Sequence, residues 1–336
     1  MSAASLSGSL SYVLPLKWSA EDDARAPELT AYLSWLRDLT EVIVVDGSPD
    51  PLFARHHAAW RTFGTHVRPD PDLSYRNGKV NGVTTGVRLA SFDKVVIADD
   101  DVRYDQRGLD RVAALLDDAE LVRPQNYFDP MPWHARWDTA RCLLNRAVAR
   151  DYPGTFGLRR STFLAMGGYN GDVLFENLEL LRTVRAAGGR EISPLNLYVL
   201  RQPPSTARFL SQRVRQAYDD FAQPWRLALW LAIVPMTATA LVRRKFGQVL
   251  MGALGVVAVA EVGRRRAGGR RVYPAITSLC APFWVLERGI CSWIAVHQRI
   301  GHGGVRYAES RFATAAHSSW WLRHPKQPLV RLRRAG

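Results

Sequence analysis

Short apolar runs alternate with amphipathic segments along the first two thirds of the chain. Apolar runs typical of strands lie at residues 11–16, 41–45, 66–68, 94–102 and 120–124. Helical spacing of apolar residues predicts helices at about 21–39, 52–63, 79–89, 109–116 and 174–182. A strand, a helix and a second strand within about thirty residues form the βαβ unit of a parallel sheet. The pattern therefore predicts an α/β fold with a Rossmann-like sheet.

The last third of the chain has a different pattern. Residues 225–242 and 246–262 are almost unbroken apolar segments, joined by Arg243-Arg244-Lys245. Seventeen or eighteen residues is about the lower limit for a bilayer span. If both segments span the membrane as a hairpin, the heavier basic cluster at 264–271 belongs on the cytoplasmic side, and the basic loop 243–245 then lies on the opposite side. Because this conflicts with the positive-inside rule, a shallow or interfacial arrangement also stays open. Pro274, Pro282, Glu287 and Arg288 interrupt residues 273–296, which favours an amphipathic surface helix there.

Three segments are predicted from these patterns. Residues 1–221 would form the α/β domain, 222–300 a membrane-associated helical region, and 301–336 a basic tail rich in Arg, His and Trp.

Composition narrows the partners. The chain of 336 residues has a net charge of +14, which fits nucleic acid, acidic lipid or a phosphorylated substrate. Because arginine is dense after residue 200, beside the apolar runs, we expect a membrane surface rather than nucleic acid. Three scattered cysteines and the absence of an N-terminal secretory pattern favour a reducing compartment, with the α/β domain facing the cytoplasm.

Charged residues follow the predicted strands where parallel sheets keep their ligands. Asp99-Asp100-Asp101 ends the run at 94–102, and Asp46 begins an Asp-Gly-Ser turn. Because successive strand residues point to opposite faces, Asp99 and Asp101 are expected to share a side and to hold one Mg²⁺ or Mn²⁺ ion, while Asp100 points away. Lys79 lies at a glycine-flanked helix start, where it can meet a phosphate. The alternatives are a solvated turn for the aspartates, a turn-forming role for Asp46 and a surface position for Lys79.

Taken together and in this order, the motifs resemble the family 2 glycosyltransferases of the GT-A fold, over residues 11–221. The resemblance implies that Asp46 contacts the nucleotide base, that Lys79, Asp99 and Asp100 lie at the donor, and that Asp99 and Asp101 hold the metal-bound diphosphate. Gly154–Tyr169 is similar to the acceptor-side segment, with its candidates Arg159, Arg160, Gly168 and Tyr169.

Two departures from the family concern the base and the acceptor. The family's Glu-Asp-x-x-Leu reads Glu176-Asn177-Leu178-Glu179-Leu180 here, and an amide cannot take a proton at neutral pH. Glu176 is the first candidate for the base, Asp172 the second, and a protein without a base the third. Glu179, a further neighbouring carboxylate, lies nearly one turn further on and is expected to face solvent. Gln212 to Gln216 is similar to the Gln-x-x-Arg-Trp of processive synthases and ceramide glucosyltransferases, with Gln212 and Arg215 kept and the Trp replaced, which argues against a processive synthase.

The resemblance implies an inverting transferase that moves a sugar from a nucleoside-diphosphate-sugar donor to a membrane lipid or glycan acceptor. It also implies dependence on Mg²⁺ or Mn²⁺. A nucleotidyltransferase of similar fold and an inactive nucleotide-sugar-binding scaffold are the alternatives, the latter motivated by Asn177. The sugar, the nucleotide, the acceptor and the oligomeric state are not predicted.

Overall fold

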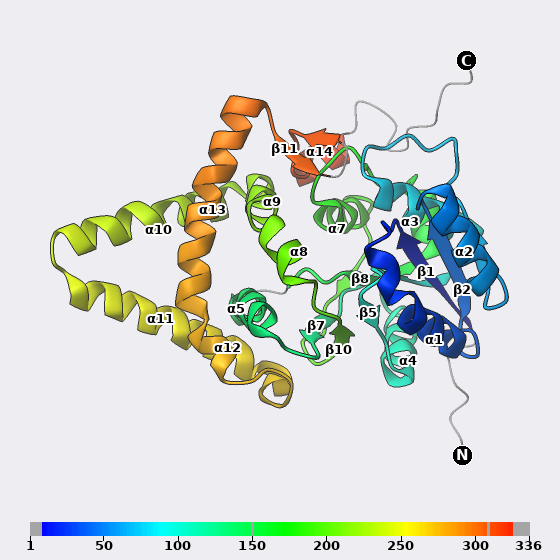
Figure 1. Cartoon of the computed structure of the whole chain (residues 1–336), viewed down its shortest axis with the longest axis horizontal. Helices are drawn as coiled ribbons and strands as arrows, with labels where there is room; N and C mark the ends of the chain where they lie inside the picture. Colours follow the sequence, from blue (N-terminus) through cyan, green and yellow to red (C-terminus); the bar gives the residue numbers. More distant parts are fainter. Residues whose placement is uncertain (1–8, 149–150, 308–309, 325–336) are drawn as a thin grey trace. The chain divides into compact units, whose positions relative to one another are not determined.

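The computed structural model describes residues 9–148, 151–307 and 310–324, and these form two compact units (Figure 1). The first unit contains the residues up to Pro124, Pro153–Val199 and the segment from Ser318. The second contains Gln125–Tyr152 and Leu200–His317. The units interleave in sequence. The three-segment division stays a prediction, and residues 325–336 of the predicted tail lie outside the described residues.

A seven-stranded sheet forms the centre of the first unit, in the order β3-β2-β1-β4-β8-β6-β9. The bounds of these strands are β1 Leu10–Leu16, β2 Glu41–Asp46, β3 Thr65–Val67, β4 Lys94–Ala98, β6 Leu121–Val122, β8 Thr155–Arg159 and β9 Glu191–Ile192. β1 pairs in parallel with both β2 and β4, and β2 in parallel with β3, whereas β8 runs antiparallel to β4. The predicted α/β sheet is therefore present, with an antiparallel strand beside β4.

Helices cover both faces of this sheet. The helices of the unit are α1 Ala26–Leu36, α2 Asp50–Trp60, α3 Gly78–Leu89, α4 Gln106–Leu115, α6 Arg160–Ala165, α7 Glu176–Ala186 and α14 Ser319–Arg323, with a 3₁₀ turn at Asp22–Arg25. Apolar residues of α1 and α4 share one buried cluster with Leu10, Tyr12 and Leu14 of β1. Residues of a strand alternate between the faces, and α3 packs on the other face, where a Cβ at Gly86 would lie 2.3 Å from Val13 Cγ1. Glycine at position 86 thus lets α3 approach β1 closely.

The second unit is mainly helical. Its helices are α5 Trp133–Val148, α8 Thr206–Ser211, α9 Arg213–Tyr218, α10 Pro224–Val242, α11 Phe246–Arg265, α12 Ile276–Leu279 and α13 Ala281–His302, with 3₁₀ turns at Asp219–Ala222 and Arg266–Arg271. The remaining strands of the chain are β5 Val102–Arg103, β7 Gln125–Phe128, β10 Tyr198–Arg201, and the hairpin β11 Val305–Tyr307 with β12 Ser310–Phe312. α5 packs tightly on α11, because a Cβ at Gly263 would lie 1.9 Å from the carbonyl oxygen of Leu143. α11 therefore covers α5, and a shortened chain that ends near Phe221 would lack α11 and expose α5 to solvent.

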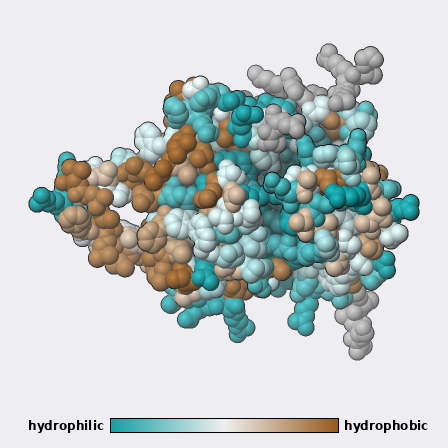
Figure 2. Space-filling model, viewed as in Figure 1, coloured by the Kyte–Doolittle hydropathy of each residue, from teal (hydrophilic) through white to brown (hydrophobic). Residues whose placement is uncertain are grey.

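Two apolar helices of the second unit are long enough to cross a membrane by length and composition. They are α10 and α11, and only 6% and 11% of their apolar windows are buried. The brown surface in Figure 2 follows this helical pair, and large apolar side chains such as Met236, Leu250 and Met251 are more than half exposed. Because the core helix of a soluble protein passes the same test when it is buried, the exposure of these two adds weight to the membrane interpretation.

The charged pair predicted to interrupt the next apolar segment faces the interior of the second unit. Arg288 donates to Asp220, with Nη2 at 2.6 Å from Oδ2, and Glu287 binds Arg213. On the side of α13 away from Arg288, apolar residues are exposed, among them Phe283, Ile290 and Trp293. α13 is therefore two-sided, with Arg288 inward, Glu287 at the boundary beside Phe283, and apolar residues outward.

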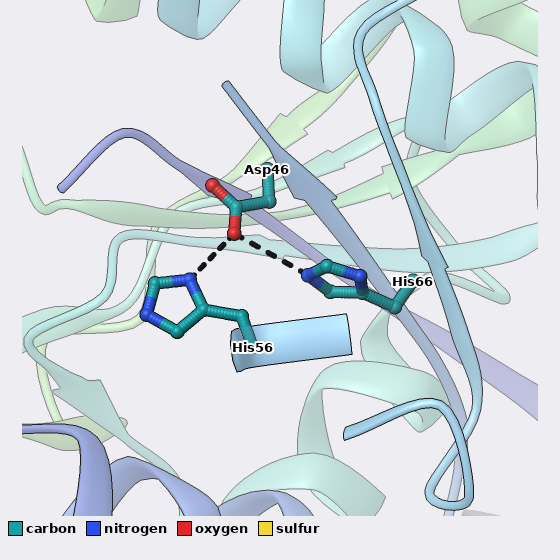
Figure 3. Close-up of side chains that lie close together, drawn as sticks. All are labelled: Asp46, His56 and His66. Carbon is teal, nitrogen blue, oxygen red and sulfur yellow. Dashed lines mark hydrogen bonds and ion pairs between the residues drawn. The ribbon is translucent and has the colours of Figure 1, made fainter. Parts of the chain in front are cut away.

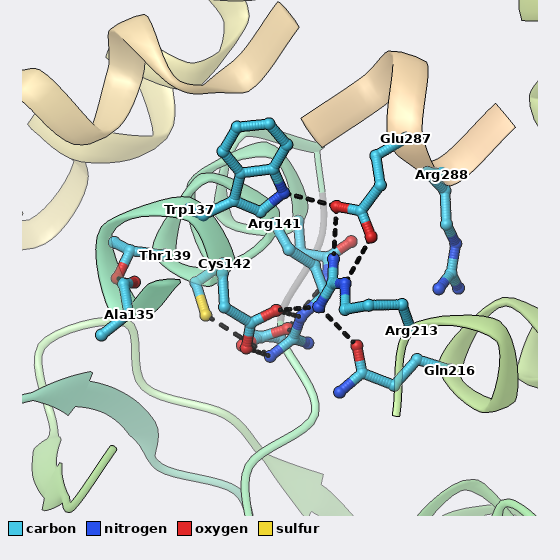
Figure 4. A network of polar contacts seen from close by, with 12 residues as sticks. Ala135, Trp137, Thr139, Arg141, Cys142, Arg213, Gln216, Glu287 and Arg288 are labelled. Atoms are coloured by element: carbon cyan, nitrogen blue, oxygen red, sulfur yellow. Dashed lines mark hydrogen bonds and ion pairs between the residues drawn. The ribbon is translucent and has the colours of Figure 1, made fainter. Parts of the chain in front are cut away.

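Figure 4 shows the ionic network that holds α5, α9 and α13 together. The guanidinium of Arg213 lies 3.1 Å from Asp138 Oδ1 and 2.5 Å from Glu287 Oε1, and it also donates to Gln216. Arg141 contacts Asp138 from the same helix. Burial alone would raise the pKa of Asp138, but the charges of Arg141 and Arg213 outweigh it and hold the pKa well below its usual range.

We expect Asp138→Asn to lower the free energy of unfolding by about 3 kcal/mol, because breaking a buried ion pair leaves uncompensated charge. A carboxylate whose folded pKa is depressed stabilises the protein above its unfolded pKa, and this contribution is lost as the pH falls below about 4. Urea unfolding at several pH values measures both effects. The exposed Asp129→Asn is the control, and equal stability of the two variants at pH 7 would contradict the account.

Candidate functional site

The carboxyl ends of β1, β2 and β4 meet at one edge of the sheet. β1 lies between β2 and β4, so the chain passes from one side of β1 to the other after β3. Ligands of open α/β sheets bind at such a change of direction, outside the carboxyl ends of the strands. Asp46 ends β2 and Asp99 follows β4, so both lie at this edge.

The side chain of Lys79 lies between two other predicted site residues, Asp99 and Glu176. Its Nζ lies 2.6 Å from Asp99 Oδ1, 3.0 Å from Glu176 Oε1 and 3.4 Å from Asn177 Oδ1. Lys79 stands in the first turn of α3, where the side chain of Asn77 caps the helix by accepting from the Lys79 N–H. Glu176 opens α7. The ends of two helices and one strand thus deliver an ammonium group between two carboxylates.

The electrostatics of this cluster keep the ammonium charged. Burial opposes the charged form, but the carboxylates of Asp99 and Glu176 outweigh it and raise the pKa of Lys79 well above its usual value. For Tyr169, burial raises the pKa of the hydroxyl well above its usual value, in the presence of the nearby charges of Lys79, Glu176 and Asp99. Tyr169 is therefore neutral at physiological pH. The side chains of Lys79, Asp99 and Glu176 remain 14–21% exposed, so the cluster is open to a ligand.

Residues 153 and 154 complete the cluster. The backbone N–H of Asp99 donates to the carbonyl of Gly154 at 2.8 Å, and a Cβ at position 154 would lie 2.5 Å from Asp99 Oδ2. The Nδ2 of Asn177 donates to the carbonyl of Pro153 at 3.2 Å. Asn177 therefore fastens the start of α7 to this loop, a role that sequence reasoning missed because it depends on contacts between distant segments.

The aspartate triplet is a turn rather than a continuation of the strand. β4 ends at Ala98, and the N–H of Val102 donates to the carbonyl of Asp99 at 3.1 Å. The alternation argument for Asp99 and Asp101 therefore does not hold, since it requires an extended backbone. Asp100 Oδ2 accepts from Trp18 Nε1 at 2.5 Å and pairs with Arg25 at 2.7 Å, and neither partner was identified from the sequence.

Asp46 lies in a buried cluster with two histidines (Figure 3). Its Oδ2 is 2.6 Å from His56 Nδ1 and 3.3 Å from His66 Nε2, and its Oδ1 accepts from the N–H of Ser48. Burial alone would raise the pKa of Asp46, but its hydrogen bonds to His56, His66 and Ser48 outweigh this and lower it. The side chain is fully buried and both oxygens are engaged, so it faces no ligand directly in this conformation. The three residues form a group that could hold a metal ion.

The predicted acceptor-side arginines lie at the other end of the sheet. β8 is antiparallel to β4 with Lys94 opposite Arg159, so Arg159 is about 13 Å along the strand from the Asp99 end. Arg159 pairs with Asp93, and Arg160 donates to the carbonyls of Val87 and Arg88. These contacts engage both arginines in anchoring the sheet, and their acceptor-side role stays a prediction.

The other predicted residues are placed as follows. Gly168 has a φ of 76° in the turn that ends α6, and this turn leads to the buried Tyr169. Asp172 Oδ1 accepts from the N–H of Arg76 at 3.2 Å and pairs with its side chain. Gln212 and Arg215 belong to the second unit, where Gln212 joins α8 to α9 and the Arg215 guanidinium lies 4.6 Å from the ring centre of Tyr307.

No family model and no curated protein matches the sequence. Among solved structures, the chain is similar to a mannosyltransferase from Pyrobaculum calidifontis in complex with GDP-Man and Mn²⁺, with 18% identity over 85% of this chain and 87% of that chain and a TM-score of 0.51. A glucosyl-3-phosphoglycerate synthase from Mycobacterium tuberculosis in complex with Mn²⁺, UDP and glucosyl-3-phosphoglycerate aligns over 60% of this chain and 74% of that chain, with 21% identity and a TM-score of 0.41. The same synthase is also known with Mg²⁺ and UDP.

The mannosyltransferase comparison concerns the fold. It confirms the predicted α/β architecture with a largely parallel sheet, which this chain shares with that mannosyltransferase. At this level of identity the comparison is evidence for the architecture and assigns no residue its role.

Proposed function

We propose that the protein is an inverting glycosyltransferase that moves a sugar from a nucleoside-diphosphate-sugar donor to an acceptor at a membrane. The observation that carries the proposal is the meeting of Lys79, Asp99 and Glu176 at the carboxyl edge of the sheet. This edge is where open α/β folds bind nucleotides. The similar mannosyltransferase was solved with GDP-Man and Mn²⁺, so a sugar nucleotide with a divalent ion is the first ligand to test.

The donor side of the site suits a diphosphate with a hard cation. Asp99 and Asp101 would hold Mg²⁺ or Mn²⁺, because carboxylate oxygens are the ligands these ions prefer, and the lack of a side chain at Gly154 accommodates the Asp99 carboxylate at this edge. When bound, the ion would neutralise charge on the leaving diphosphate. The ammonium of Lys79 would bind the same phosphates from the start of α3. Asp46 and Asp100 take positioning roles, since their carboxylates are bound to His56, His66, Trp18 and Arg25.

We assign the base to Glu176. As an acceptor hydroxyl attacks the anomeric carbon, the bond from that carbon to the diphosphate breaks, and the carboxylate takes the hydroxyl proton. Glu176 is held at the N-terminus of α7 by Lys79, and the helix end favours its negative charge. Asp172 is engaged by Arg76, and Glu179 is fully buried rather than facing solvent. Of these three candidate carboxylates, Glu176 is the one in contact with Lys79, the donor residue that also pairs with Asp99.

The second unit supports the membrane context. The exposed apolar surface of α10 and α11 would contact lipid, with the first unit on the cytoplasmic side and the acceptor a membrane lipid or glycan. Membership of family 2, the likeness of Gln212 and Arg215 to the ceramide glucosyltransferase motif, and acceptor-side roles for these two residues, Gly168 and Tyr169 belong to the same proposal.

Replacing Leu250, Met251 and Leu254 together with aspartate is expected to reduce binding to lipid vesicles at least tenfold. Each charge at the centre of an embedded helix costs about 2.5 to 3.5 kcal/mol, and these side chains are 53–67% exposed, so the fold should survive. Vesicle flotation of the full chain measures the loss. Leu89→Asp, at an exposed position of the first unit, is the control, and equal flotation of both variants would reject the helical pair as the lipid contact.

The reaction class is tested by the product released from a panel of nucleotide sugars in Mg²⁺ or Mn²⁺, with and without membrane lipid extract. A glycosyltransferase releases nucleoside diphosphate, and lipid extract should accelerate the release. A nucleotidyltransferase, given a nucleoside triphosphate and a sugar phosphate, releases pyrophosphate instead. Donor binding without release of either product would favour the inactive scaffold.

A further inference from the structure

The buried cluster of Asp46, His56 and His66 is built like a metal site. The three side chains come from β2, α2 and β3 and converge from three sides (Figure 3). One ligand atom from each lies within 4.8 Å of the others, and none of the three side chains is more than 2% exposed. Donor atoms bound to one ion at about 2.0 to 2.2 Å are themselves separated by less than about 4.4 Å, so small side-chain shifts suffice to surround an ion.

The remaining polar atoms of the three residues are also held. His56 Nε2 lies 3.1 Å from Asp23 Oδ1, and Asp23 pairs with Arg55 at 2.8 Å. His66 Nδ1 lies 3.1 Å from His57 Nδ1. A carboxylate on the far nitrogen of a histidine is the usual outer contact of metal-binding imidazoles, because it fixes the ring and raises the basicity of the other nitrogen.

We propose that Asp46 Oδ2, His56 Nδ1 and His66 Nε2 bind one divalent transition-metal ion, with Zn²⁺ the expected occupant. Two imidazoles and one carboxylate favour Zn²⁺ over Mg²⁺ or Mn²⁺, which prefer oxygen ligands alone. The site is therefore chemically distinct from the hard-cation site proposed at Asp99 and Asp101. It does not depend on the proposed function.

The ion would fasten α2 and β3 to the end of β2. Trp18, which follows β1, packs on the ring of His56 with centroids 5.5 Å apart and donates to Asp100 at the aspartate turn. An ion that holds the ring of His56 in place would therefore also hold Trp18, and through Trp18 the Asp100 carboxylate at the proposed donor edge. The metal-free alternative is a doubly protonated His56 between the carboxylates of Asp46 and Asp23, which satisfies the same atoms without an ion.

The test uses the full chain, stripped of metal by a chelator, dialysed, and titrated with Zn²⁺ or Co²⁺ in excess Mg²⁺. We expect one Zn²⁺ per chain by elemental analysis, visible absorption of bound Co²⁺ typical of nitrogen ligands, and a rise in Tm of about 5–10 °C at a hundredfold excess of Zn²⁺ over Kd. His56→Gln and His66→Gln should each weaken Zn²⁺ binding at least tenfold. The exposed His297→Gln is the matched control and should bind as wild type does.

Asp23→Asn provides a variant that keeps all three ligands. Loss of an outer contact typically weakens metal binding about 10- to 100-fold, so this variant should retain one site of lower affinity even if the histidine variants fail to fold. Absence of stoichiometric Zn²⁺ and of the Co²⁺ absorption in the wild-type chain would overturn the proposal in favour of the protonated His56. Binding that the Asp23 and histidine variants leave unchanged would overturn it as well, by assigning the ion to other histidines.

Discussion

Replacing Asp99 with asparagine is expected to lower turnover about 10³-fold or more. The carboxylate of Asp99 is proposed to hold the divalent ion. It also pairs with Lys79, whose Nζ lies 2.6 Å from Asp99 Oδ1. Stabilisation of developing charge by a bound metal ion is worth several kcal/mol, which corresponds to about three powers of ten in rate. Chelating the metal in the wild-type protein should produce a loss of similar size.

The comparison of variant and chelator separates metal binding from mere packing. If Asp99 acts through the ion, Asp99→Asn should need more Mg²⁺ or Mn²⁺ than the wild-type protein for its half-maximal rate. The exposed Asp118→Asn should keep both the wild-type rate and its sensitivity to chelation. Full wild-type activity in excess chelator would remove the metal from the mechanism and leave Asp99 as a partner of Lys79 alone.

Glu176→Gln is expected to lower turnover about 10²- to 10⁴-fold, the usual cost of losing a general base. Glutamine keeps the size of the side chain and can still accept a hydrogen bond from Lys79, which is 3.0 Å from Oε1 in the wild-type chain. The donor should therefore bind with nearly unchanged affinity. The loss should fall on kcat.

Two variants judge this assignment. Glu21→Gln, at an exposed position of the first unit, should behave as wild type does. Asp172→Asn removes the rival carboxylate and should cost less than tenfold, because Asp172 is engaged by Arg76. Near wild-type turnover of Glu176→Gln together with collapse of Asp172→Asn would transfer the role to Asp172, and wild-type rates in both would favour a protein without a base.

Much of the first unit was predictable because its signals are local. The buried runs of β1, β2 and β4 and the amphipathic spacing of α1 and α3 follow from the sequence pattern alone. The same holds for the position of Asp46 and Asp99 at strand ends. The contact of Lys79 with Asp99 and Glu176 was not predictable in detail, although all three residues were proposed, because Lys79 and Glu176 are almost a hundred residues apart in the chain.

Pairing between distant segments could not be predicted from the local sequence. Nothing in that sequence gives the antiparallel register of β8 on β4, which puts Arg159 and Arg160 at the other end of the sheet from Asp99. The aspartate triplet was treated as extended, yet the chain turns after Asp99, whose carbonyl accepts from the N–H of Val102. His66 was missed because it meets Asp46 only through the parallel pairing of β2 and β3.

The central claim, sugar transfer to a membrane acceptor, is tested most directly by following labelled sugar. The purified protein is incubated with nucleoside-diphosphate sugars labelled in the sugar, GDP-mannose and UDP-glucose first, together with Mn²⁺ and membrane lipid extract. The account predicts that label from at least one donor enters the lipid fraction with equimolar release of nucleoside diphosphate, and that Asp99→Asn abolishes both. Label that stays entirely in the donor, or that leaves it at the same rate in Asp99→Asn, would contradict the account.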